Sequence, residues 1–332
     1  MHDVGFYLIV AVVAFSLAFD FINGFHDTAN AIATSVTTRA IPPERAVLMA
    51  AALNFIGALV STGVAKTIGG DIIKSPDLIN QEVILAALIS AILWNLLTWK
   101  MGIPSSSSHT LIGGLMGAAV MHQGIDILKM SGIIRIIASL ILSPLIALGG
   151  GSVIMIMLLW IFRKMSPSFL NEKFLKAQIV SAAMMAFSHG ANDAQKAMGI
   201  ITVAFLSGGY ITTMDVPFWV KVSAALAMGC GTAVGGWKII RTMGGKIFKL
   251  EPISGFAADL NSSLVIFAAT LLHLPVSTTH VVSGSIMGVG VAKRVKAVRW
   301  GTAQQMLMAW VLTIPISAIV AGICYKAIMF FM

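Results

Sequence analysis

Charged side chains are scarce in this chain of 332 residues. Lys, Arg, Asp and Glu together make up 11% of it, whereas a typical soluble domain has about 25%. Apolar runs long enough to cross a bilayer, about 20 residues, recur along the chain instead; examples are 46–65, 83–99, 133–162 and 300–332. Short segments of alternating polarity, which mark a membrane barrel, are absent. The composition therefore predicts an all-α polytopic membrane protein.

Cysteine, long polar loops and a basic N-terminal segment are also lacking. The two cysteines, Cys230 and Cys324, lie in apolar segments and indicate neither a disulfide framework nor a metal site. Without a basic start, the first apolar segment is expected to stay as a helix rather than be cleaved. No loop is long enough for a separate domain, so the chemistry is expected within the membrane. The formal charge of +9 lies in short loops, as orientation signals do, so nucleic acid is not expected as a partner.

Two short polar motifs occur twice, in the same order. Residues 23–27 (NGFHD) and 189–193 (HGAND) align on their Gly and Asp with an offset of 166. Residues 104–109 (PSSSSH) and 275–280 (PVSTTH) align with an offset of 171, and glycines and a proline further on match at the same spacing. Many secondary transporters build one central site from polar patches duplicated in two membrane-embedded repeats.

The basic loops change sides between the two halves. Loop 39–45 is basic, whereas its counterpart 207–217 carries only Asp215, and two further matched loops show the opposite bias. Because basic loops stay in the cytoplasm, equivalent loops face opposite compartments. The halves 1–165 and 166–332 are therefore predicted to be inverted-topology repeats. Both termini are expected outside the cytoplasm, in a multi-pass protein of the cell membrane.

Helical hairpins and broken helices are expected within each repeat. Two pairs of segments must leave from and return to the same side, with the Ser/Thr motif at the turn. These pairs are 82–100 with 104–122, and 255–273 with 276–292. Whether the hairpins are re-entrant or fully spanning stays open. Since Asn and Gly are poor helix formers, a break is expected at Asn23 and Gly24, and another within 188–192.

The duplicated Asp motif is expected to hold a cation. A carboxylate deep in a membrane costs about 2.5–3.5 kcal/mol unless it has a partner, and amide oxygens nearby are ligands that hard cations such as sodium favour. Lys196 follows Asp193 by three residues and could neutralise it on one helix face. The plainer alternative is that the carboxylates only fix helix packing. The predicted sodium-binding residues are Asp27, Asp193, Asn23, Asn30 and Asn192.

The Ser/Thr turns are expected to hold an anion. Each follows a proline and precedes an apolar, glycine-rich helix, so each resembles a helix N-terminal cap. The first turn of a helix presents unpaired N–H groups and a partial positive charge. Two such ends would surround a tetrahedral oxyanion, although the plainer alternative is capping alone. The predicted anion-binding residues are Ser106, Ser107, Ser108, Thr110, Ser277, Thr278 and Thr279.

At these motifs the chain resembles a known family. Residues 23–31 (NGFHDTANA) and 188–196 (SHGANDAQK) are similar to the two signatures of the inorganic phosphate transporter (Pit) family in its bacterial form, and the paired P-x-S-x-x-H turns fit the same family. The resemblance covers essentially the whole chain. It implies a secondary transporter, often homodimeric, that moves inorganic phosphate with sodium or protons and needs no cofactor beyond the co-transported ion. On this basis Asp27 and Asp193 would bind the coupling ion, and the Ser/Thr turns would contact phosphate.

The coupling ion and other classes of function stay open at this point. Many eukaryotic relatives carry a glutamate where this chain has Asn54, and the loss of that candidate proton acceptor favours sodium. Alternatives are proton-coupled transport of phosphate or metal-phosphate, transport of another oxyanion such as sulfate, and a channel. A hydrolase using Ser105 and His109 is disfavoured, because acyl transfer needs one nucleophile rather than two symmetric copies. The protein is therefore not expected to be an enzyme.

Overall fold

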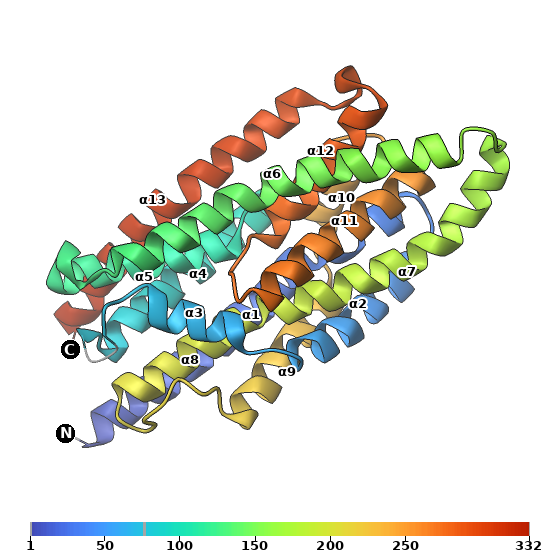
Figure 1. The fold of residues 1–332 in the computed structure, drawn as a ribbon. Helices are drawn as coiled ribbons and strands as arrows, with labels where there is room; N and C mark the ends of the chain where they lie inside the picture. The colour runs from blue at the N-terminus through green and yellow to red at the C-terminus, as the bar shows by residue number, and fades with distance from the viewer. Residues whose placement is uncertain (1, 76–77, 332) are drawn as a thin grey trace.

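The fold is an elongated bundle of α-helices (Figure 1). The computed structural model describes residues 2–75 and 78–331, and within these ranges there is one isolated β-bridge, between Ile73 and Leu128, and no strand. The first half contains α1 (His2–Thr37), α2 (Pro43–Ala58), α3 (Gly63–Asp71), α4 (Gln81–Met101), α5 (Ser107–Gln123) and α6 (Met130–Ile161). The second half contains α7 (Pro167–Asp193), α8 (Gln195–Ser207), α9 (Phe218–Val234), α10 (Trp237–Gly245), α11 (Pro252–Leu271), α12 (Thr278–Lys293) and α13 (Trp300–Phe331).

The two halves contain the same elements in the same order. α1 corresponds to α7 together with α8. The next pair, α2 and α3, is bent by 68°, and its counterpart, α9 and α10, is bent by 73°. The hairpins α4–α5 and α11–α12 follow, and each half closes with a helix of 32 residues, α6 or α13, that contains a proline (Pro144 or Pro315). The all-α repeat architecture with hairpins is thus confirmed. The predicted division between residues 165 and 166 falls in the connection between α6 and α7.

The helix breaks lie away from the Asp motifs. α1 continues without interruption through Asn23 and Gly24, so the break expected there is wrong. In the second half, α7 continues through 188–192 and ends only after Asp193, so the expected break is displaced toward its C-terminal end. The sharp bends lie instead between α2 and α3 and between α9 and α10.

The motif glycines serve close helix packing rather than a break. A Cβ on Gly24 would collide with the carbonyl oxygen of Met228 in α9, and a Cβ on Gly190 with that of Asn54 in α2. Each motif helix therefore touches the backbone of a helix from the other half, at matched positions. Glycine is a poor helix former in isolation. Within a membrane, however, every backbone group must find a partner, and this packing keeps the helix continuous.

Glycines also let the hairpins pack on the long helices of the opposite half. Gly113 and Gly117 of α5 face the backbone of α13, while Gly284 and Gly288 of α12 face that of α6. Small residues four apart allow helices to approach closely in membranes, and these two glycine pairs do so here. The two repeats are therefore interlocked rather than set side by side.

Replacing Gly288 by alanine is expected to destabilise this interlocked packing. The new methyl group would collide with the Leu148 carbonyl oxygen of α6, and overpacking of this kind costs about 1–3 kcal/mol. Gly149→Ala is the matched control, because its Cβ would meet nothing within 4 Å and alanine is the better helix former by about 1 kcal/mol. Thermal unfolding in detergent should show a lower midpoint for Gly288→Ala alone. Equal midpoints for the two variants would contradict the packing argument.

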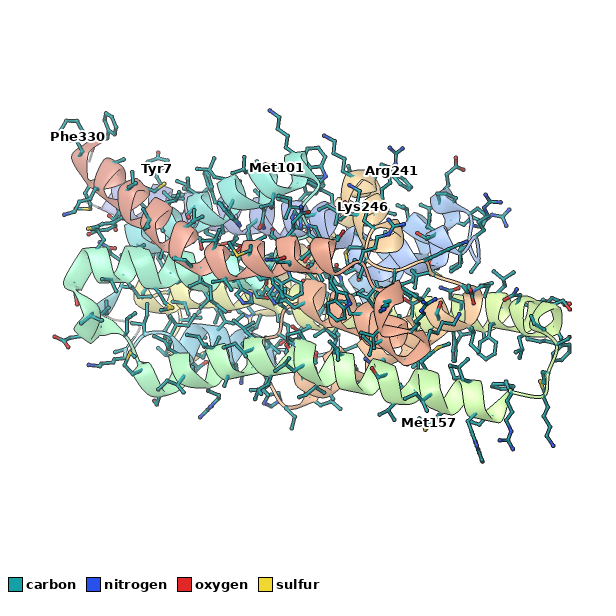
Figure 2. All side chains as sticks on the ribbon, turned by 90° about the horizontal axis from the view of Figure 1, so that it is seen from above. Tyr7, Met101, Met157, Arg241, Lys246 and Phe330 are labelled. Atoms are coloured by element: carbon teal, nitrogen blue, oxygen red, sulfur yellow. The ribbon has the colours of Figure 1, made fainter. Side chains whose placement is uncertain are left out.

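Apolar side chains cover the outside of the bundle (Figure 2). Those exposed on α6 and α13 include Ile134, Ile141, Leu145, Ile156, Val311, Ile319 and Phe330. A continuous apolar surface of this extent suits lipid rather than water. Among the described helices, five are long and apolar enough to cross a membrane, and up to seven spans result if each bent pair counts as one. Tyr7 and Phe330, near the two termini, lie at the same end of the bundle (Figure 2).

The turns of the two hairpins meet inside the bundle. Ser108 Oγ of the first turn donates to the Val276 carbonyl oxygen of the second over 2.8 Å. Beyond them, the ring centroids of His109 and His280 lie 4.5 Å apart. The hairpin α4–α5 enters from the end with the termini and α11–α12 from the other end (Figure 1). The two hairpins thus reach the middle of the bundle from opposite ends, and their first arms, α4 and α11, are both among the five helices long and apolar enough to cross a membrane.

Candidate functional site

Each hairpin turn leads into a capped helix. After α4 the chain turns at Gly102, with φ of 68°, and after α11 it turns at the matched residue His273, with φ of 58°. It then runs extended to Ser106 or Ser277, whose hydroxyl oxygen accepts a hydrogen bond from the backbone N–H three residues on. The predicted N-terminal caps are thus present. The first turns of α5 and α12 lie at the centre of the bundle, where their helix dipoles place partial positive charge.

Asp27 of α1 is held by both hairpins. Its side chain is only 2% exposed. Ser107 Oγ of α5 donates to Asp27 Oδ2 over 3.3 Å, and Thr279 Oγ1 of α12 donates to Oδ1 over 3.4 Å. His26 Nδ1 lies 2.6 Å from the same Oδ1, and its Nε2 lies 3.2 Å from Thr98 Oγ1 of α4. One carboxylate therefore joins α1 to turns from opposite halves.

Asp193, at the end of α7, is held by the second hairpin, by α1 and by α8. Thr278 Oγ1 donates to Asp193 Oδ2 over 3.1 Å, and Asn23 Nδ2 donates to the same oxygen over 3.5 Å. Lys196 Nζ lies 2.9 Å from Oδ1 and also donates to Ser107 Oγ over 3.4 Å. These side chains are all buried, and they connect the Asp193 group to the Asp27 group.

The combined cluster holds two carboxylates against one ammonium. Lys196 and His189 lie at ion-pair distance from Asp193, whereas among the described residues Asp27 has His26 alone at such a distance. Removing charges from water is expensive, and an uncompensated buried charge is destabilising. The excess of carboxylates over ammonium groups in this cluster favours binding of a cation.

Amide oxygens without hydrogen-bond partners lie in the same region. Asn23, Asn30 and Asn192 each donate through Nδ2 to a neighbouring side chain, while none of their Oδ1 atoms has a partner in the described part of the chain. Three further side chains each offer a ligand atom, all within 4.8 Å of one another; these are Asp27, His189 and Asp193. Hard cations favour carboxylate and amide oxygens, so the oxygens of this region fit a hard cation such as sodium.

Other predicted site residues support the turns rather than contact the carboxylates. Ser106 and Ser277 cap their helices, and Ser108 bonds to the opposite turn. Thr110 Oγ1 donates back to a backbone carbonyl of its own turn over 2.7 Å. Asn192 Nδ2 donates to a threonine hydroxyl of α11 over 2.9 Å. Through these hydrogen bonds, the five residues hold the two turns and the end of α7 in position.

Sequence reasoning does not propose a site role for three residues that extend the network, which are His26, His189 and Thr232. His189 Nδ1 lies 3.1 Å from Asn54 Oδ1, and Asn54 Nδ2 donates to Thr232 Oγ1 over 2.8 Å. His26 contacts Asp27 directly. Both histidines lie inside the duplicated motifs, and His189 precedes Asp193 by four residues, a spacing that signals one helix face. For Thr232 the only signal is a hydroxyl within an apolar segment.

Comparisons with known sequences agree on one family. The model of the phosphate transporter family matches residues 23–174 and again 164–321. A probable low-affinity inorganic phosphate transporter of Bacillus subtilis is 53% identical over 325 residues, which cover 97% of this chain and 98% of that protein. A protein of the same description from Rhizobium meliloti is 45% identical over 324 residues, covering 97% of each chain.

A solved structure gives the same answer. It is described as the sodium-dependent phosphate transporter, and it superposes with a TM-score of 0.85 at 25% sequence identity, covering 98% of this chain and 100% of that one. The family model matches both halves, and the relatives are covered almost completely. This chain belongs to the phosphate transporter family.

Proposed function

We propose that this protein imports inorganic phosphate together with sodium, through the site between the two hairpin turns. The observation that carries the proposal is that Asp27 and Asp193 accept hydrogen bonds from the first turns of α5 and α12. A pair of carboxylates suited to cations thus touches a pair of helix ends suited to an anion. The names of the relatives support phosphate as the substrate, and that of the solved structure supports sodium as the coupling ion.

Bound sodium would allow the two helix ends to bind phosphate. The hydroxyls of Ser107, Thr278 and Thr279 donate to the carboxylates, and two carboxylates repel an approaching phosphate. Sodium ions at Asp27 and Asp193 would neutralise that field and release the hydroxyls to bind phosphate oxygens. Each ion then favours the other, and this reciprocal coupling is the requirement for symport.

The inverted repeats supply the two states that transport needs. A hairpin reaches the site from each end of the bundle. Movement of one repeat against the other would open one side while the second hairpin keeps the other side closed. The proposal includes both termini outside the cytoplasm, the basic loops inside, and a place in the cell membrane. Assembly as a homodimer, which the family resemblance implies, belongs to the same proposal.

Uptake of labelled phosphate into proteoliposomes tests sodium coupling. We expect an inward sodium gradient to raise the initial rate by about tenfold or more, within the usual range of coupling energies. Equal sodium on both sides and an inward proton gradient are the two controls. Stimulation by protons alone would assign the site to proton coupling. Uptake that responds to neither gradient would rule out coupled transport of phosphate.

Competition during the same uptake assay separates the remaining functions. Arsenate, which shares the tetrahedral shape and charge of phosphate, should compete, whereas strong competition by sulfate would indicate a broader oxyanion transporter. A conductance that does not saturate would favour a channel. The hydrolase alternative loses its predicted pair, because His109 Nδ1 lies 2.7 Å from the capping Ser106 Oγ, whereas Ser105 Oγ lies 3.3 Å from His26 Nε2. Labelling by a serine-reactive probe would revive that alternative.

A further inference from the structure

Asp20 of α1 is a buried carboxylate that the central site does not use. Its side chain is fully buried, and neither carboxylate oxygen has a hydrogen-bond partner among the described residues. It precedes Asp27 by seven residues, two turns of the same helix. The second half has Ala186 at the matched position, so Asp20 is not part of the duplicated motif. An ionisable side chain inside a membrane bundle marks a functional site by default.

Two further oxygens without partners lie on the same face of α1. Ser16 precedes Asp20 by four residues and Asn23 follows it by three, which are the spacings that make side chains neighbours on a helix. Both residues are fully buried, and Ser16 Oγ and Asn23 Oδ1 have no hydrogen-bond partner within the ranges that the structure describes. A carboxylate, a hydroxyl and an amide oxygen thus gather on one stripe of α1, N-terminal to the central cluster.

The free hydroxyl of Ser16 is informative because helical hydroxyls usually bond to their own backbone. A buried Ser or Thr commonly donates to the carbonyl four residues earlier, as Thr28, Thr202 and Thr232 do here. Ser16 makes no such bond in the described structure. Its oxygen is therefore available beside Asp20 as a ligand.

Asp20 also forms no ion pair with any residue that the structure describes. Of the charges near it, that of Lys196 attracts the carboxylate and that of Asp193 repels it. Lys196 is already committed, since its Nζ lies 2.9 Å from Asp193 Oδ1 and donates to Ser107. Asp20 thus adds a further carboxylate to a group that contains one ammonium, and a bound cation would compensate for it.

We propose that Asp20 is the carboxylate of a further sodium site on the N-terminal side of the central site, with Ser16 one turn before it on the helix and Asn23 one turn after it. The proposal rests on the sodium-coupled function proposed above. Asn23 links the two sites, because its Nδ2 donates to Asp193 while its Oδ1 is free for the cation. An ion at Asp20 would therefore order a side chain that holds Asp193. An ion that enters from the end with the termini would meet Asp20 before Asp193.

Sodium binding to the purified protein in detergent tests this site without transport. The thermal unfolding midpoint is measured against rising sodium chloride, with choline chloride keeping the ionic strength constant. Because cation affinity follows the charge of the ligands, Asp20→Asn should need about tenfold more sodium for the same shift, a change that corresponds to about 1.4 kcal/mol. Phosphate uptake by this variant should also show a lower Hill coefficient for sodium. Ser35→Ala is the control and should behave as the wild type, since its hydroxyl donates to the Ile32 carbonyl of α1.

Each outcome decides between separate claims. A wild-type sodium dependence in Asp20→Asn, in both unfolding and uptake, would overturn the Asp20 site and leave the proposed function intact. A wild type that shows no response to sodium would overturn both. Ser16→Ala keeps the charge and should weaken sodium binding in the same direction but by less. If Asp20→Asn does not fold, unchanged sodium binding in Ser16→Ala overturns the site.

Discussion

Asparagine in place of Asp27 or of Asp193 is expected to reduce sodium-driven phosphate uptake by about 100-fold or more. A hydrogen bond to a charged group is worth about 1.5–3 kcal/mol, and each 1.4 kcal/mol is about a factor of ten. Asp27 accepts from Ser107 and Thr279, so at least two such contacts weaken. The variant also removes the charge that would hold sodium.

The measurement is the initial rate of labelled phosphate uptake at saturating and at limiting sodium. Asp126→Asn is the matched control, because it makes the same chemical change on an exposed residue of the loop before α6 and should leave the rate unchanged. The midpoint of thermal unfolding shows whether each variant is folded. Rates within a few-fold of the wild type in both Asp27→Asn and Asp193→Asn would dismiss the role of the carboxylates.

Features that repeat along the chain could be predicted because a duplicated site must use the same residue types twice. The pairs Asp27 with Asp193 and Ser106 with Ser277 indicate two related turns and two related helices, and the structure brings all four into one region. Apolar length and loop charge then predict helical repeats. Motif spacing, apolar length and loop charge predict a feature correctly where the feature depends on residues close together in the sequence.

Features that depend on contacts between distant segments could not be predicted. From sequence alone Gly24 is predicted to break the helix, yet its missing side chain is what lets the backbone at Met228, from the other half, pack closely. The bond between His189 and Asn54 joins residues 135 positions apart. Asp20 has no counterpart in the second half, so repeat comparison passes over it. For Gly24 and for His189, the role depends on a backbone or polar atom that a distant segment brings next to the residue.

Replacing Lys196 by methionine is expected to destabilise the protein by about 3–5 kcal/mol, the usual cost of breaking a buried ion pair. Methionine has a long unbranched side chain and fills irregular space well, so the main loss is the ammonium that pairs with Asp193. Lys129→Met is the matched control. Its ammonium lies 2.7 Å from Asp71 but is 39% exposed, and a surface pair of this kind is worth about 1 kcal/mol or less.

A second substitution separates the structural role of Lys196 from transport. Adding Asp193→Asn to Lys196→Met removes the unpaired carboxylate, so thermal unfolding of the double variant should return toward the wild type. Uptake should stay lost, because the proposed sodium site includes the same carboxylate. High sodium should also stabilise the single variant Lys196→Met more than the wild type, since a bound cation would replace the missing ammonium. A double variant no more stable than Lys196→Met would contradict the pairing, because the two substitutions would then act independently.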